Sequence, residues 1–149
     1  MFDIAVFGAG RIGRIHARNV VAHPALRLKY LVDPAPDAAG LAGQTGAALV
    51  DTNRVLGDPG IAGVIIASPT HLHLDQCLQA VAAGKAVFCE KPIDLDLQRA
   101  RAAHARLTAP NVRLLLVVPM ASSCIFALAN RMAPLLKRIS ASFALVFGR

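Results

Sequence analysis

The sequence is short of charged residues and lacks the features expected of a secretory leader, and each shortage argues against a class of protein. Charged residues make up 17% of the 149 residues, whereas hydrophobic residues make up 55%. Because a disordered chain needs low hydrophobicity and high charge, this composition predicts a folded protein, and the length suits one domain. Met1 is not followed by a basic segment and a long apolar run, so we expect no signal peptide and a cytoplasmic location.

Cysteine is also scarce, and the sequence predicts no metal site. Cys77, Cys89 and Cys124 are the three cysteines. An odd number without metal-ligand spacing favours neither a disulfide framework nor a zinc site, and it fits a reducing compartment. His71 and His73 lie two residues apart at the expected start of a helix, so their rings point in different directions, and no third ligand is evident.

Acidic residues are missing from the last third of the chain. All nine lie at or before Asp96, which gives residues 1–96 a net charge of −1 and residues 97–149 a net charge of +8. Such a tail raises the alternative of a basic nucleic-acid-binding protein, whose binding falls steeply with salt. Against this alternative, the tail has no recognised motif and few aromatic residues, so we expect no nucleic-acid partner.

A long hydrophobic run is absent as well. The longest uncharged stretch, between Arg113 and Arg131, has 17 residues and is diluted by Pro119 and by polar side chains. This length is at the bottom of the range that spans a bilayer. We therefore expect no membrane span.

Short apolar runs alternate with helix-like segments, which is typical of βαβ units and a parallel sheet. The first strand shows no polar alternation, so it is expected to be buried on both faces. In the first helix we expect Ile12, Ile15, Ala17 and Val20 to be buried. The expected strands are 3–7, 26–32, 64–67, 86–89 and 112–118, with a short one near 48–50, and the expected helices are 11–22, 71–83 and 97–107, with a weak helical signal in 38–49. This pattern predicts an α/β Rossmann-type, doubly wound sheet with strand order 3-2-1-4-5-6.

A glycine-rich motif lies between the first strand and the first helix. Gly8, Gly10 and Gly13 match G-x-G-x-x-G, with Arg11 and Ile12 inside the motif. Gly8 allows a tight turn, Gly10 lets the backbone approach a pyrophosphate, and Gly13 lets the helix pack closely on the strand. The helix N-terminus presents free N–H groups and a positive dipole end to phosphates. The motif in this context predicts a dinucleotide site.

Asp33 ends the second strand, 20 residues after Gly13. A carboxylate at this position accepts hydrogen bonds from both ribose hydroxyls and repels the 2′-phosphate of NADP. The following segment 34–36 supplies no arginine to neutralise that phosphate. The sequence therefore predicts NAD as cofactor, the alternative being that Asp33 only caps a turn.

Two further motifs follow later strands. Ser68-Pro69-Thr70 and the histidines after it come where open α/β sheets bind ligands, so we expect one of these histidines to line the cofactor pocket. After the strand at 86–89, Glu90-Lys91-Pro92 places a lysine in a partly desolvated crevice. Lys91 is predicted to donate a hydrogen bond or carry a proton with Glu90 as its partner, the alternative being a solvated surface salt bridge.

These motifs, in this order, resemble the Gfo/Idh/MocA family of NAD(P)-dependent sugar and cyclitol oxidoreductases, from residue 2 to about residue 118. Within that family, the run at 11–17 and Asp33-Pro34 are most similar to the inositol dehydrogenases. The resemblance implies a polyol or sugar substrate, a cis bond before Pro92, and Lys91 as the catalytic group; it leaves open a homo-oligomer. It also implies that NAD is bound by Gly8, Gly10, Arg11, Ile12, Gly13, Asp33, Ser68, Pro69, Thr70, His73 and Glu90.

The chain departs from the family pattern toward its end. Family members carry a second α/β domain with the substrate pocket and an Asp/His pair, which these 149 residues do not include, and segment 118–123 is atypical. We expect an NAD(P)-binding domain at 1–118 and an atypical basic tail at 119–149, arising from a frameshift or truncation near residue 117. The expected function is that of an NAD-dependent dehydrogenase, the alternative being a noncatalytic NAD-binding fragment or a defective gene product.

Overall fold

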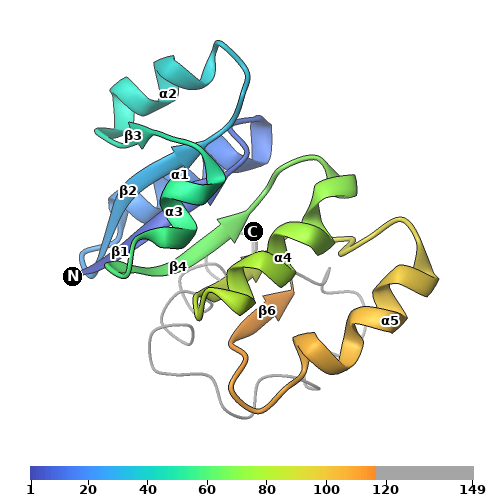
Figure 1. The fold of residues 1–149 in the computed structure, drawn as a ribbon. Helices are drawn as coiled ribbons and strands as arrows, with labels where there is room; N and C mark the ends of the chain where they lie inside the picture. Colours follow the sequence, from blue (N-terminus) through green and yellow to red (C-terminus); the bar gives the residue numbers. More distant parts are fainter. Residues whose placement is uncertain (117–149) are drawn as a thin grey trace, which may run out of the picture.

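A computed structural model describes residues 1–116, in which helices cover both faces of a parallel sheet (Figure 1). The six strands follow the order β3-β2-β1-β4-β5-β6, and every neighbouring pair is parallel. The predicted α/β class and strand order are therefore confirmed. The strands are β1 (Phe2–Phe7), β2 (Leu26–Val32), β3 (Ala48–Leu49), β4 (Ile61–Ile66), β5 (Ala86–Cys89) and β6 (Leu114–Leu116).

The helices follow the expected positions with two differences. A short helix, α3, was not predicted; it begins after Asp51, whose carboxylate accepts a hydrogen bond from the backbone N–H of Arg54 at 2.7 Å. The helix expected at 71–83 is instead a 3-10 turn followed by an α-helix. The helical elements are α1 (Arg11–Ala22), α2 (Ala38–Thr45), α3 (Thr52–Gly57), η1 (Thr70–Leu72), α4 (His73–Ala82) and α5 (Leu97–Leu107).

Some strand ends also differ from the expectation. β4 begins three residues earlier than expected, at Ile61. Ile61 and Gly63 pair with β1, and Gly63 also pairs with β5, although glycine has no side chain to pack. The strand expected at 112–118 is seen as β6 within the described residues. β6 begins at Leu114, two residues later than expected. Residues 117–118 of the expected strand, the basic tail and most of the uncharged run after Arg113 lie outside the described residues.

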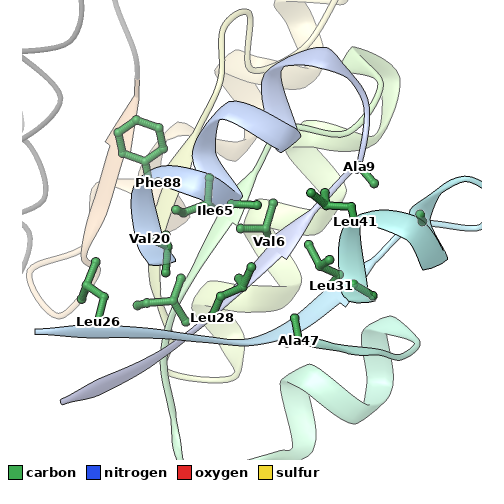
Figure 2. Packing of buried hydrophobic residues seen from close by; sticks show 14 of the residues in the cluster. Val6, Ala9, Val20, Leu26, Leu28, Leu31, Leu41, Ala47, Ile65 and Phe88 are labelled. Atoms are coloured by element: carbon green, nitrogen blue, oxygen red, sulfur yellow. The ribbon is translucent and has the colours of Figure 1, made fainter. Parts of the chain in front are cut away.

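Two apolar clusters hold the helices on the sheet. On one face, residues of α1 and α2 pack against β1, β2, β4 and β5, and Figure 2 shows Val6, Val20, Leu41, Ile65 and Phe88 converging there. On the other face, α3, α4 and α5 pack against the same strands. Residues 4–7 of β1 are at most 2% exposed, so the predicted burial of β1 on both faces is confirmed.

The buried face of α1 is offset from the predicted one. Ala17 and Val20 are buried as expected, whereas Ile12 and Ile15 are only half-buried. Gly13 and His16 take their place on the sheet-facing side. The reason is steric: a glycine lets the first turn of the helix lie against the sheet, and the residue one turn later then faces inward.

At the amino end of the strands, an aspartate joins three segments. The Asp58 carboxylate accepts hydrogen bonds from Lys29 Nζ at 2.7 Å, Tyr30 OH at 2.9 Å and the backbone N–H of Gly60 at 2.8 Å. Lys85, 6% exposed, donates to the backbone carbonyl of Asp58 at 2.6 Å. This cluster fastens β2 and the start of β5 to the loop before β4, away from the carboxyl ends of the strands.

Three further features concern the described residues alone. They contain no helix long and apolar enough to cross a membrane. Within the same residues, no three His, Cys, Asp or Glu side chains are grouped closely enough to bind a metal ion. Cys77 and Cys89 are buried free thiols.

Acid should destabilise the domain through Asp58. Lys29, Gly60 and Tyr30 hold the pKa of Asp58 well below its ordinary value of 3.8. A carboxyl whose pKa is depressed by folding contributes stability above its unfolded pKa, and this contribution is lost as the pH falls through the folded pKa. We expect Asp58→Asn to lower the melting temperature at neutral pH and the difference from wild type to shrink below about pH 3.

Thermal melts between neutral and acid pH measure this effect. The matched control is Asp51→Asn, since asparagine also caps a helix and this carboxylate is exposed. We expect the control to differ little from wild type at any pH. A melting-temperature difference for Asp58→Asn that is constant over the acid range would contradict the prediction.

Candidate functional site

The predicted motifs meet at the carboxyl edge of the sheet. Gly8 N–H donates to the Val32 carbonyl at 2.8 Å, which joins the glycine turn to the residue before Asp33. Ala67 N–H donates to the Phe7 carbonyl at 2.8 Å, and Glu90 N–H donates to the Ile66 carbonyl at 2.9 Å. The segments after β1, β2, β4 and β5 are therefore hydrogen-bonded neighbours, as the edge of an open α/β sheet requires for a ligand site.

Neighbouring backbone atoms leave no room for a side chain at Gly8 or at Gly13. Gly8 has a φ of +96°, and a Cβ there would lie 2.5 Å from the Ala67 carbonyl oxygen. A Cβ at Gly13 would lie 1.8 Å from the Gly8 carbonyl oxygen. The tight turn and the close helix packing that the motif predicts are both present.

Gly10 differs from these two glycines. A Cβ added to Gly10 has no heavy atom within 4 Å, and the residue is exposed. Gly10 is the N-cap of α1 and no side chain caps that end, so the first N–H groups of α1, at Arg11 and Ile12, receive no capping hydrogen bond from a side chain. Arg11 is exposed and Ile12 half-buried. Uncapped N–H groups at a helix N-terminus, beside a glycine with free space at its Cβ position, fit the pyrophosphate of a dinucleotide.

Asp33 has two roles within the protein itself. One carboxylate oxygen accepts from the backbone N–H of Ala9 at 2.6 Å, inside the glycine turn. The other accepts from the backbone N–H of Ala35 at 2.7 Å, which is the turn cap considered as the alternative. Because each carboxylate oxygen accepts more than one hydrogen bond, both can still receive a ribose hydroxyl. Asp33 is half-buried, beside the glycine turn.

The segment after β4 is held in place by α4. Ser68 Oγ hydrogen-bonds Gln76 Oε1 at 2.6 Å, while Pro69 is exposed and Thr70 is half-buried at the start of η1. His73 is 2% exposed, and both of its ring nitrogens are in contact with backbone carbonyls. His71, by contrast, is exposed. The ring of His73 therefore contacts protein backbone and supports the segments after β4 and β5.

The segment after β5 differs from the prediction in two respects. Lys91 is exposed rather than desolvated. The Lys91–Pro92 bond, by contrast, is cis as expected. Glu90 pairs with His16 Nε2 of α1 at 2.8 Å instead of with Lys91. The hydrogen bond from His16, aided by the charge and backbone N–H of Lys91, lowers the pKa of Glu90. The Glu90 side chain is therefore an anion at neutral pH, and the Lys91 ammonium has no hydrogen-bond or ion-pair partner among the described residues.

His16 and Gln76 are the residues near the site that the sequence analysis did not assign. His16 is 1% exposed and lies edge-on to the Phe88 ring, with centroids 5.3 Å apart. Its position three residues after Gly13 was the available signal, since residues three apart share one helix face. Histidine is not a usual core residue, so the periodicity alone favoured Ile12 and Ile15.

The sheet order, the glycine turn and the uncapped helix end define a Rossmann-type dinucleotide-binding domain. A family model described as "Oxidoreductase family, NAD-binding Rossmann fold" (GFO_IDH_MocA) matches residues 2–117. The chain belongs to this family of oxidoreductases, and its cofactor is NAD. The match to this family model ends at residue 117, one residue before the predicted domain boundary. The boundary at 118 stays a prediction.

The similar proteins include inositol dehydrogenases. Inositol 2-dehydrogenase of Rhizobium meliloti (strain 1021) is 42% identical over 98 residues, which are 65% of this chain and 30% of that protein. The structure of a putative myo-inositol dehydrogenase from Sinorhizobium meliloti 1021 is 35% identical with a TM-score of 0.75, covering 78% of this chain and 36% of that one.

A third similar structure contains ligands. Scyllo-inositol dehydrogenase from Lactobacillus casei with bound NAD(H) and scyllo-inositol is 29% identical with a TM-score of 0.72, covering 78% of this chain and 36% of that one. The chain thus spans about a third of the length of the relatives it matches. It is related to NAD-dependent inositol dehydrogenases through their NAD-binding domain.

Replacement by alanine should have different effects at Gly10 and at Gly13. At Gly13 the new methyl group would meet the Gly8 carbonyl, so we expect a loss of about 3 kcal/mol or more in unfolding free energy. At Gly10 the methyl group meets open space, so we expect a change within about 1 kcal/mol. The same methyl group would block the pyrophosphate, and NAD binding should weaken at least about tenfold.

Denaturant unfolding and calorimetric titration with NAD measure the two effects separately. Each variant is the control for the other, because both add one methyl group to the same turn. If Gly10→Ala binds NAD with wild-type affinity, the pyrophosphate does not bind next to Gly10. If Gly13→Ala has wild-type stability, the close packing of Gly13 on the Gly8 carbonyl is contradicted.

Proposed function

We propose that this chain is the NAD-binding part of an oxidoreductase that oxidises a secondary alcohol of a polyol or sugar, in particular an inositol. The observation that carries the proposal is the exposed Lys91 ammonium at the carboxyl edge of the sheet, on the segment hydrogen-bonded to β4 beside the glycine turn. The relationship to inositol dehydrogenases supports the substrate class.

The cofactor residues fit the pyrophosphate and the adenosine ribose of NAD. The glycine turn and the N-terminus of α1 bind the pyrophosphate, and Asp33 binds the adenosine ribose hydroxyls. When bound, NAD supplies the hydride acceptor at nicotinamide C4. In the overall oxidation, the carbinol carbon loses a hydride, the hydroxyl loses a proton, and the alcohol becomes a ketone.

Lys91 binds the reacting hydroxyl oxygen. Its ammonium donates up to three hydrogen bonds and is not engaged by other described side chains, so it is available to substrate. A positive charge at the hydroxyl oxygen stabilises the negative charge that develops there as the proton leaves. The Glu90 carboxylate remains hydrogen-bonded to His16 and keeps its negative charge next to Lys91.

Neither buried histidine at this edge is available as the base that takes the hydroxyl proton. His16 is buried against Glu90, and His73 has both ring nitrogens on carbonyl oxygens. The resemblance to the family assigns this step to an Asp/His pair of a second domain. The alternative proposal, a noncatalytic NAD-binding fragment, shares every residue of the cofactor site and differs only in turnover.

NAD should bind more tightly than NADP because of the charge of Asp33. We expect Asp33→Asn to narrow the NAD-to-NADP affinity ratio by about tenfold, since it removes like-charge repulsion of the 2′-phosphate. Asparagine keeps one acceptor oxygen for Ala9 or Ala35, which makes it a milder change to the turn than alanine.

Calorimetric titrations with both cofactors measure the ratio. Asp75→Asn is the matched control, because it removes the same charge from the exposed surface of α4 and should leave the ratio unchanged. Equal affinities of the wild-type chain for NAD and NADP would refute the assignment of Asp33.

The purified 149-residue chain should bind NAD yet show no measurable oxidation of inositol. General acid/base catalysis contributes typically ~10²–10⁴-fold and substrate orientation contributes further, and the resemblance to the family assigns the base and the substrate pocket to a second domain. NADH fluorescence with NAD and inositol measures turnover. NADH production by the wild-type chain that Lys91→Ala abolishes would show that the chain is a complete catalyst and would exclude the noncatalytic alternative.

A further inference from the structure

The residues on both sides of Lys91 are each held by a buried histidine. Before Lys91, the Glu90 carboxylate contacts His16 Nε2 at 2.8 Å. After it, the Pro92 carbonyl oxygen contacts His73 Nδ1 at 2.8 Å. We refer to His16 and His73 with these two contacts as the histidine bracket.

The two histidines come from helices on opposite faces of the sheet. His16 belongs to α1, which packs in the cluster shown in Figure 2, and His73 is the first residue of α4, which packs in the other cluster. They are 1% and 2% exposed, respectively. Because side chains packed in a core have few rotamers available, each histidine fixes its contact on the segment 90–92.

Each histidine also has a second contact that ties the bracket to the cofactor site. His16 lies one turn after Gly13 on the helix whose N-terminus forms the pyrophosphate site, and its ring packs on Phe88 of β5. His73 Nε2 lies 2.7 Å from the carbonyl oxygen of Ser68, in the segment after β4. The segments that carry Lys91, Ser68 and the glycine turn are thereby connected through two side chains.

We propose that His16 and His73 are positioning residues that set the place of the Lys91 ammonium relative to the bound cofactor. The importance of that placement rests on the proposed function, in which Lys91 holds the reacting hydroxyl. The Lys91 side chain is exposed and its ammonium has no hydrogen-bond or ion-pair partner among the described residues, so its position depends on the backbone that the two neighbouring residues hold. Catalytic groups need such supporting contacts, because a misplacement of about 1 Å is costly to rate.

Local hydrogen exchange in the ligand-free chain is the first test. We expect His16→Met to speed exchange in the peptide covering residues 90–95 by about tenfold, the factor expected for losing a hydrogen bond to a charged group. Exchange in β1 and β4 should stay within about twofold of wild type. His16→Gln should restore wild-type exchange, since its amide nitrogen can occupy the position of Nε2 and donate to Glu90.

The matched control is His23→Met, the same substitution just after the other end of α1, where the ring accepts a hydrogen bond from the Ala25 backbone N–H. We expect no change at residues 90–95 in this variant. Equal loosening of β1, β4 and the 90–95 peptide in His16→Met, or no loosening at all, would overturn the proposal. If His16→Met does not fold, Glu90→Ala breaks the same contact from the half-exposed side and gives the same readout.

Cofactor fragments provide the second test. ADP reaches the glycine turn and Asp33, whereas NAD adds the nicotinamide end beside Lys91. We expect His16→Met to weaken NAD binding about fivefold or more and ADP binding less than about twofold. Equal weakening of both ligands would show a general effect on α1 and overturn the positioning role. If the wild-type chain binds neither ligand, the proposed function fails, whereas the exchange experiment still decides the histidine bracket.

Discussion

The close approach of the glycine turn to the start of α1 is the constraint on which the site depends. Gly13 lies so near the Gly8 carbonyl that no side chain fits between them, and Gly8 is itself pressed against the end of β4. This contact brings the N-terminus of α1 to the carboxyl edge of the sheet. It also turns His16, one helical turn later, into the core, where it meets Glu90. The turn proposed for phosphate binding thus also determines which residue contacts the segment that carries Lys91.

The two ends of the sheet serve different purposes. At the amino end, Asp58 joins Lys29, Tyr30 and Lys85 in contacts whose polar groups are mutually satisfied. At the carboxyl edge, the N–H groups of α1 and the Lys91 ammonium are left without side-chain partners among the described residues. Unsatisfied donors cost stability where they are buried, but here they face an open surface. The amino end therefore stabilises a fold whose other end stays available to ligand.

The sequence predicted the fold well because its strongest signals are local. Unbroken apolar runs marked most of β1, the end of β4 and the whole of β5, glycine spacing marked the turn before α1, and Asp33 followed β2 at the expected distance. The missed helix α3 is only six residues long and buries one side chain, Val55, so it has no hydrophobic period to recognise. The buried face of α1 was predicted from apolar residues alone. That rule held at Ala17 and Val20 and failed at Ile12 and Ile15, because close packing at Gly13 brings Gly13 and His16 to the side of the helix that faces the sheet.

The partner of Glu90 could not be predicted from the sequence, because it depends on a contact between residues 74 positions apart. Adjacent opposite charges suggested an ion pair between Glu90 and Lys91, yet neighbouring residues that leave a strand point to opposite sides. Glu90 turns toward α1 and leaves the ammonium exposed, and this separation is what a substrate-binding lysine needs. A lysine paired with its neighbouring carboxylate would have to exchange that partner for the substrate hydroxyl. With Glu90 engaged by His16, the carboxylate keeps its charge beside the site while the Lys91 ammonium remains available to an incoming hydroxyl.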